Sequence, residues 1–177
     1  MADSAEVSMN SMTYLGLGSN LGDRAGNLAI AVERLSQEIA IKEISSIYET
    51  KPVGYKEQPF FLNAVVSAET ELDPFELLHF IKRIESDMGR KPGFRNAPRL
   101  IDIDILFYED MIIRTGELTV PHPGIADRAF VLVPLAEIAG EFVHPVSQRK
   151  VGDLLAEVDG GAGVRGVGRL SVRETIN

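Results

Sequence analysis

The chain has 177 residues, a formal net charge of -8 at pH 7 and no cysteine. The lack of cysteine excludes disulfides, thiolate metal ligands and a cysteine nucleophile, and the acidic balance argues against a protein that binds nucleic acid over a broad basic face. Hydrophobic residues make up 45% of the chain, which is enough for one domain of ordinary size to bury its own core.

The two ends of the chain differ in composition from its middle. Residues 1–12 are polar and have no apolar period, so we expect a disordered extension. Residues 13–159 are expected to form a single domain, and the glycine-rich residues 160–177 a loosely packed tail. The first residues lack the basic and apolar regions of a secretory signal, and no apolar run is long enough to span a bilayer. These features lead us to expect a soluble, cytoplasmic protein.

Hydrophobic periodicity and turn residues divide the domain into alternating strands and helices. In chain order we expect a strand at 13–18, a helix at 23–38, strands at 41–49 and 60–72, a helix at 74–88, a strand at 101–106, and helices at 130–138 and 151–158. Asp23 and Asp73 are placed to cap the first two helices, and Pro74 suits a first helical position. The order β-α-β-β-α-β predicts an α+β, ferredoxin-like fold, with helices on one face of an antiparallel sheet and further C-terminal elements.

Three glycines, Gly16, Gly18 and Gly22, occur between the first strand and the first helix. Their spacing fits neither the dinucleotide-binding pattern nor the lysine-bearing phosphate-binding pattern. Tight turning is therefore the simpler interpretation of these glycines.

Three other polar residues each have two interpretations. Asn63, on the same strand face as Phe61, would either present a carbonyl and an amide to a heterocycle or end the strand by bonding to a loop. Glu85 lies beside the apolar face of the second helix, where a surface glutamate is the simpler interpretation. His122, between two prolines, is held on a stiff loop, and such a histidine is either structural or functional.

Residues 101–106 read Ile-Asp-Ile-Asp-Ile-Leu, and successive side chains of a strand point to opposite faces. The isoleucines would then enter the core while Asp102 and Asp104 point into a cleft. At a rise of about 3.3 Å per residue their backbones lie about 6.5 Å apart, which allows both carboxylates to share hard cations. We interpret the pair as magnesium ligands; the alternative is that both face water on a half-buried strand.

The stretch that precedes this strand, from Arg90 to Ile101, contains four basic residues and no acidic one. In a chain of net negative charge this local reversal suggests an anionic ligand such as a polyphosphate. The alternative is that these basic side chains decorate a solvated loop.

Several motifs, in this order, resemble those of the 6-hydroxymethyl-7,8-dihydropterin pyrophosphokinase family of folate biosynthesis, over Thr13 to Leu155. The matching pieces are Leu-Gly-Ser-Asn-Leu-Gly-Asp from Leu17, Tyr-Glu-Thr-Lys-Pro-Val-Gly from Tyr48, Gln-Pro-Phe-Phe-Leu-Asn-Ala from Gln58, Ile-Glu from Ile84, Gly-Arg from Gly89, Pro-Arg-Leu-Ile-Asp-Ile-Asp-Ile-Leu from Pro98 and Val-Pro-His-Pro from Val120. Each piece is modest alone, whereas their order together is highly specific.

The resemblance implies a reaction and its participants. Enzymes of this family move a diphosphate from MgATP to the hydroxymethyl group of the pterin and leave AMP, on a ferredoxin-like α+β fold without a P-loop. ATP is then the co-substrate, 6-hydroxymethyl-7,8-dihydropterin the substrate, and two Mg2+ ions the metal cofactor. Neither nucleic acid nor a membrane is expected as a partner, and association with other folate-pathway enzymes is left open.

The resemblance also implies roles for individual residues. Asp102 and Asp104 match the metal ligands, and Arg90 and Arg99 match catalytic arginines that stabilise the transferring phosphates. The positions that match the ATP site are Lys82, Glu85, Arg95, Arg99, Ile105 through its backbone, Thr119, His122 and Arg128. The positions that match the pterin site are Thr50, Lys51, Val53, Phe61, Asn63 and Phe130, the two phenylalanines by stacking on the ring.

The chain departs from the family at Asn96 and Ala97, where a tryptophan and a glycine are common. No residue is identified as a general base. Two other classes of function stay open. One is a non-catalytic, small-molecule-binding regulatory module on the same fold, which would bind its ligand without consuming ATP. The other is an RNA-binding sheet, which the net charge disfavours.

Overall fold

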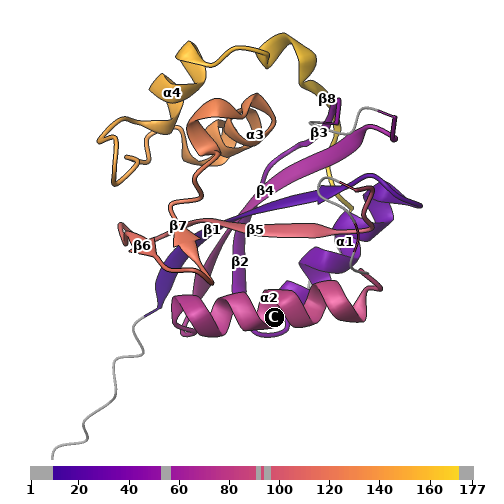
Figure 1. Cartoon of the computed structure of the whole chain (residues 1–177), viewed down its shortest axis with the longest axis horizontal. Helices are drawn as coiled ribbons and strands as arrows, with labels where there is room; N and C mark the ends of the chain where they lie inside the picture. The colour runs from indigo at the N-terminus through magenta and orange to yellow at the C-terminus, as the bar shows by residue number, and fades with distance from the viewer. Residues whose placement is uncertain (1–9, 53–56, 91–92, 94–96, 172–177) are drawn as a thin grey trace, which may run out of the picture.

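The structure is a computed structural model, and it describes residues 10–52, 57–90, 93 and 97–171 (Figure 1). Its strands are β1 (Ser11–Ser19), β2 (Ala40–Ile44), β3 (Ile47–Thr50), β4 (Phe61–Thr70), β5 (Asp102–Tyr108), β6 (Ile113–Arg114), β7 (Thr119–Val120) and β8 (Arg165–Gly168). Its α-helices are α1 (Arg24–Leu35), α2 (Pro74–Asp87), α3 (Ala129–Ala139) and α4 (Val151–Glu157). Within the described part of the chain, every helix is too short or too polar to cross a membrane.

One antiparallel sheet organises the described residues. It has six strands in the order β5-β1-β4-β3-β8, and β2 also pairs with β4, farther along that strand than β3 does. A two-stranded sheet of β6 and β7 lies apart from it. The mixed α and β architecture with an antiparallel sheet is thus confirmed.

The expected single strand at 41–49 is divided into β2 and β3. The division falls at Ser45 and Ser46, whose polar groups bond away from a regular ladder. The Ser45 hydroxyl accepts from the backbone N–H of Val65 at 2.9 Å, and Ser46 donates through both its N–H and its hydroxyl to Glu137. Side chains that replace backbone partners in this way interrupt a strand.

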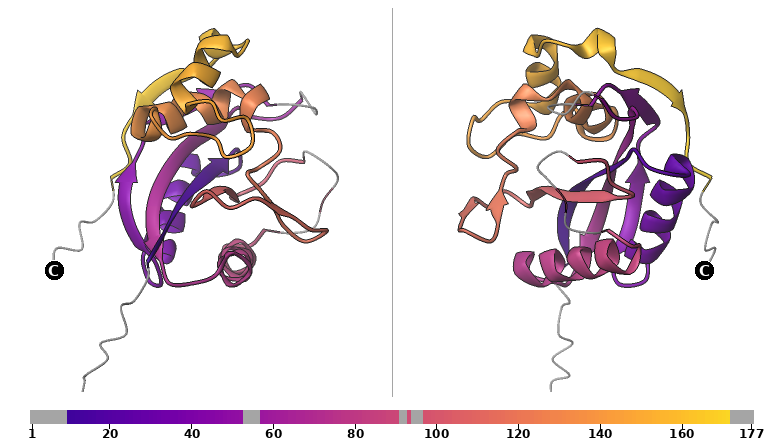
Figure 2. Two further views of the ribbon diagram at one scale, coloured as in Figure 1. Left: turned by 90° about the vertical axis from the view of Figure 1, so that its left-hand side faces the viewer. Right: turned by 45° about the vertical axis from the view of Figure 1, so that its right-hand side comes forward.

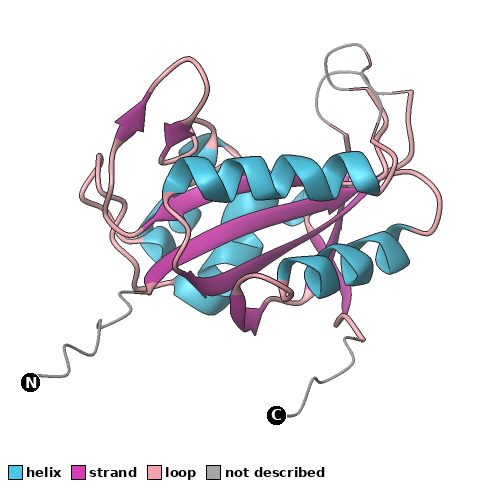
Figure 3. Ribbon diagram, turned by 90° about the horizontal axis from the view of Figure 1, so that it is seen from below, coloured by secondary structure: helices cyan, strands magenta, loops and turns pink. Residues whose placement is uncertain are grey.

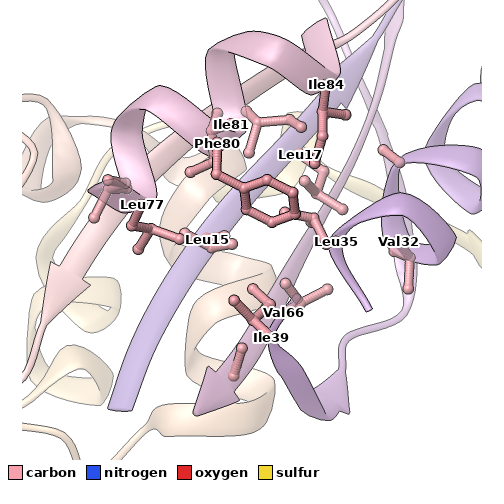
Figure 4. Packing of buried hydrophobic residues seen from close by; sticks show 14 of the residues in the cluster. Leu15, Leu17, Val32, Leu35, Ile39, Val66, Leu77, Phe80, Ile81 and Ile84 are labelled. Atoms are coloured by element: carbon pink, nitrogen blue, oxygen red, sulfur yellow. The ribbon is translucent and has the colours of Figure 1, made fainter. Parts of the chain in front are cut away.

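The larger core lies between the sheet and the pair α1 and α2, which cover one face side by side (Figure 3). Leu15 and Leu17 of β1 meet apolar residues from both helices, among them Leu35 and Ile81 (Figure 4). The strand alternation decides which residues enter this core: Val66 does, whereas its neighbour Val65 points to the other face.

The second core lies on that other face, under α3 and α4 (Figure 2). Val65, Leu106 and Phe107 of the sheet pack against apolar residues of the two helices, including Leu132 and Leu135. Helices therefore lie on both faces: the expectation of one covered face describes α1 and α2, and the C-terminal helices are added on the opposite side. Beside α3, the same face of β1 and β5 lines a hollow.

Both expected helix starts are confirmed by their caps. The Asp23 carboxylate accepts from the N–H of Gly26 at 3.1 Å. Asp73 accepts from the N–H groups of Phe75 and Glu76, and the Glu76 carboxylate accepts from the Asp73 N–H, which completes a capping box.

The ends of the domain carry more regular structure than composition indicates. β1 begins at Ser11, and β8 lies inside the glycine-rich segment, paired with β3. All four residues of β8 are exposed, so no buried alternation marks the strand in the sequence. Backbone hydrogen bonding to a sheet edge needs no apolar side chain.

We expect Leu15→Ala to lower the free energy of unfolding by about 2–5 kcal/mol, because the side chain is fully buried and a cavity would remain. Ile30 on α1 is 44% exposed, so Ile30→Ala should change the free energy of unfolding by less than about 0.5 kcal/mol. Urea denaturation of both variants measures the difference. Equal losses would contradict this assignment of the core.

Candidate active site

The two aspartates of β5 lie on the sheet face opposite the α1 and α2 core. Ile103 and Ile105 enter that core, so Asp102 and Asp104 point the other way. In the register of β1 with β5, Gly18 stands opposite Asp102 and Gly16 opposite Asp104. Residues opposite each other on neighbouring strands point to the same face. The carboxylates therefore flank a pair of positions that have no side chain.

Gly16 and Gly18 lie within β1, so their interpretation as turn residues is wrong; Gly22, with φ of 66°, is the turn residue of the three. A Cβ on Gly18 would lie 3.0 Å from Asn63 Oδ1 and 3.5 Å from the Phe61 ring. Glycine at this position therefore lets the side chains of β4 approach the site closely.

The hollow above these glycines, which we call the sheet-face pocket, collects residues from distant parts of the chain. Those predicted as site residues that line it are Thr50, Lys51, Phe61, Asn63, Arg99, Asp102, Asp104, Arg128 and Phe130. The structure thus brings together the two aspartates, two arginines and most of the residues assigned to the pterin.

One end of the sheet-face pocket is formed by β3, β4 and the start of α3. Thr50 pairs with Phe61 in the register, and the Asn63 amide donates to the Thr50 hydroxyl at 2.7 Å. Phe130 lines the same hollow, and the Arg128 guanidinium carbon lies 5.8 Å from its ring centre. Aromatic faces and a side-chain amide are suited to a flat, hydrogen-bonding heterocycle.

Glu85 connects α2 to the aspartates, and its interpretation as a surface residue is wrong. It is only 2% exposed, and its carboxylate accepts from the Ile103 N–H at 3.2 Å. The Arg90 guanidinium bonds to Glu85 and also donates to Asp102 at 2.9 Å. Arg90 therefore neutralises a buried glutamate and one member of the aspartate pair together.

Arg99 stands between the sheet-face pocket and a second hollow. Its guanidinium lies 3.8 Å from Asp102 Oδ2 and 5.5 Å from the centre of the Phe61 ring. The Arg99 Nε is buried and has no hydrogen-bond partner. Within the described residues, no other buried side-chain nitrogen or oxygen is unpaired in this way. A buried donor left unpaired costs free energy unless a ligand satisfies it.

Asn20, which the sequence reasoning missed, fixes the backbone of Arg99. Its Oδ1 accepts from the Arg99 N–H at 2.8 Å, and its own N–H donates to the Arg99 carbonyl at 3.1 Å. The amide group donates to Gln58 at 2.7 Å and to the Pro59 carbonyl. The sequence could have indicated this role, because Asn20 directly follows an apolar strand. A polar side chain at such a position is buried only when it forms hydrogen bonds.

The second hollow, which we call the loop pocket, lies between α2 and the chain around Arg99. It is lined by Leu21, Lys82, Glu85, Ser86, Gly89, Arg90, Gly93, Ala97, Pro98, Arg99 and Leu100. Lys82 contributes a cation there and lies 3.2 Å from Glu85 Oε1. Of the residues predicted for the ATP site, Lys82 and Glu85 line the loop pocket, Arg128 lines the sheet-face pocket, and Arg99 lines both.

The remaining predicted residues lie in different surroundings. The Ile105 side chain is in the core, so only its backbone is available to a ligand. Thr119 is exposed on β7 and lines neither hollow. His122 is half-buried, its Nδ1 accepts from the Gly124 N–H at 3.1 Å, and burial and the nearby Arg128 lower its pKa. Arg95 and Val53 lie outside the described residues.

The electrostatics of the aspartate pair fit a divalent cation. Burial, with the negative charges of Asp102 and Glu85, raises the pKa of Asp104 to about 7 from its ordinary 3.8. In the described part of the chain, no three His, Asp or Glu side chains are grouped to hold an ion. Two carboxylates together with substrate phosphates suit Mg2+, which commonly takes only one or two protein ligands.

Phosphoryl transfer is the chemistry that this arrangement supports, because paired acids hold ions while guanidinium groups meet phosphate charge. Residues 14–140 match the family model described as 7,8-dihydro-6-hydroxymethylpterin-pyrophosphokinase. The chain belongs to that family. It is accordingly a pyrophosphokinase, and the non-catalytic binding module is not favoured.

Curated relatives include 2-amino-4-hydroxy-6-hydroxymethyldihydropteridine pyrophosphokinase of Aquifex aeolicus, 46% identical over 144 residues, 81% of this chain and 90% of the relative. The Bacillus subtilis protein of the same name is 49% identical over 132 residues, 73% of this chain and 79% of the relative. The chain spans 21% of the Dictyostelium discoideum folic acid synthesis protein FOL1, at 48% identity over 77% of this chain.

The fold has counterparts among solved structures. A crystal structure of wild-type Plasmodium falciparum HPPK-DHPS superposes with a TM-score of 0.67 at 18% identity, over 84% of this chain and 45% of that chain. At this identity the likeness shows the fold alone.

The raised pKa of Asp104 predicts a pH dependence. The folded state keeps the Asp104 proton up to about pH 7 while the unfolded chain loses it near 3.8, so between these values this group makes the metal-free protein less stable as pH rises. Mg2+ binds the ionised carboxylate, so its stabilising effect should grow up to about pH 7 and then level off. Thermal unfolding with and without Mg2+ over this range measures both effects. A Mg2+ effect of constant size, or the same rise in Asp104→Asn, would contradict the prediction.

The position of Arg90 predicts a stability change in the metal-free protein. Arg90→Ala leaves Glu85 buried without its main cation, and we expect a loss of about 2–4 kcal/mol in the free energy of unfolding. Arg83→Ala is the matched control, because that arginine is exposed and its nearest pairing, with Glu38, is 3.7 Å long. If urea titrations give the two variants the same stability, Arg90 does not compensate Glu85.

Proposed function

We propose that this pyrophosphokinase transfers the diphosphate of MgATP to the hydroxymethyl group of 6-hydroxymethyl-7,8-dihydropterin, releasing AMP. The observation that carries the proposal for the site is the unpaired, buried Nε of Arg99, whose guanidinium group lies 3.8 Å from Asp102. A phosphate oxygen is the kind of acceptor that would satisfy it. We also propose that the fold is ferredoxin-like. The strand order β5-β1-β4, with both β2 and β3 paired to β4, supports this assignment.

The pterin is placed at the β3 and β4 end of the sheet-face pocket. Phe61 and Phe130 would contact the two faces of its flat ring, which favours stacking. Asn63 is oriented by its bond to Thr50, and its carbonyl oxygen would accept from a ring N–H. Backbone groups near Lys51, and Val53 beyond the described residues, would bond the remaining edge.

The ATP phosphates are placed between the pterin and the loop pocket. Asp102 and Asp104 would hold two Mg2+ ions, and these ions would offset the negative charge of the phosphates. Arg90 and Arg99 are proposed to contact the transferring diphosphate. The remaining proposed ATP contacts are Lys82, Glu85, Arg95, Thr119, His122, Arg128 and the Ile105 backbone.

The proposed step exchanges one bond to phosphorus for another. The hydroxymethyl oxygen of the pterin bonds to the β-phosphorus as the bond from that phosphorus to the AMP oxygen breaks, and the hydroxyl proton is released to solvent. Arg90 and Arg99, which both line the loop pocket, would meet the negative charge that increases on the diphosphate during transfer. Once the arginines and the metal ions surround the bound diphosphate, the transfer itself would need little reorganisation, so positioning and electrostatics would carry the catalysis.

The product identifies the reaction. Incubation of the protein with MgATP and the pterin should yield AMP and pterin diphosphate in equal amounts. Asp102→Asn should lower the rate more than about a hundredfold, because an amide holds the metal and its phosphates poorly. Asp110→Asn makes the same chemical change in an exposed turn and should keep full activity. Formation of ADP would mean an ordinary kinase, and an active Asp102→Asn enzyme would remove the proposed metal site.

A further inference from the structure

The C-terminal strand β8 lies beyond residues 14–140, which match the family model. It nevertheless pairs with β3, whose last residue, Thr50, lines the sheet-face pocket. β8 pairs with β3 at the edge of the sheet (Figures 1 and 2). In this register Glu49 stands opposite Arg165 and Tyr48 opposite Gly166. The residue after Glu49 is Thr50, the hydroxyl partner of Asn63.

On one side of β3, Glu49 connects β8 to the start of β4. Its carboxylate lies 2.8 Å from Arg165 Nη2 and 3.0 Å from Arg24 Nη1. Arg24 also donates to the Phe60 carbonyl at 2.8 Å, directly before Phe61. Hydrogen bonds from Arg24 and Arg165 lower the pKa of Glu49, so this carboxylate stays charged. A series of charged contacts thus connects Arg165 of β8, through Glu49 of β3 and Arg24, to the backbone of Phe60.

On the other side of β3, Glu137 of α3 makes a second connection. It accepts from the Ser46 hydroxyl and from the Tyr48 hydroxyl, each at 2.7 Å. Arg169, just after β8, lies 3.6 Å from the same carboxylate. Leu170 follows Arg169 and packs against the larger core. The C-terminal segment therefore supplies a cation to each of the two carboxylates that hold β3.

We infer that the C-terminal strand positions the pterin end of the active site: Arg165 and Arg169 fix β3 through Glu49 and Glu137, and β3 in turn sets Thr50 and the β4 residues that bind the ring. This inference rests on the proposed function. It predicts an asymmetry, because β3 contributes Thr50 to the sheet-face pocket and no residue to the loop pocket. Pterin binding should depend on the two arginines, and ATP binding should not.

The test is steady-state kinetics on the full chain, with AMP formation followed as pterin and MgATP are varied separately. The double variant Arg165→Glu/Arg169→Glu should raise the KM for pterin about two- to fivefold, the range expected for loss of partly exposed ion pairs. The KM for ATP and kcat should stay within about twofold of the parent. Arg165→Lys keeps the charge and should retain most of the pterin affinity.

Arg149→Glu is the matched control, because it reverses a charge in an exposed pair with Glu157 that does not touch β3. It should leave both KM values unchanged. If the double variant folds poorly, Arg165→Ala tests the Glu49 connection alone and should raise the pterin KM in the same direction. An unchanged pterin KM, or equal rises for pterin and ATP, would overturn the inference while the parent still forms AMP. A parent chain that forms no AMP would instead refute the proposed function.

Discussion

The site depends on how the sheet holds two carboxylates side by side on a partly buried strand. Strand alternation sends Ile103 and Ile105 into the core and so obliges Asp102 and Asp104 to share the opposite face. Burial, together with the repulsion from the neighbouring negative charges of Asp102 and Glu85, raises the pKa of Asp104. Arg90 offsets part of the charge, and a bound cation would offset the rest.

The surrounding elements are arranged by this constraint. α2 contributes Glu85, which holds Arg90 against Asp102. Because Gly16 and Gly18 have no side chains, space is left between the two carboxylates and β4.

The sequence predicted most of the elements, because periodicity and capping residues such as Asp73 act locally and the structure repeats them. It also placed both aspartates on one face, since alternation needs only neighbouring residues. It missed features that depend on partners distant in sequence. Glu85 is buried because Arg90 and the Ile103 N–H meet it, and the glycines of β1 have their role through the register with β5 and β4. β8 has no apolar pattern, so only its pairing with β3 reveals it.

The most direct test is a crystal structure of the chain with Mg2+, a non-hydrolysable ATP analogue and the pterin. We expect oxygen atoms of both Asp102 and Asp104 at about 2.1 Å from bound metal, as Mg2+ requires. Arg99 Nε should donate to a phosphate oxygen, and Arg90 should have exchanged its bond to Asp102 for the diphosphate. Metal bound away from both aspartates, or phosphates remote from Arg99, would contradict the account.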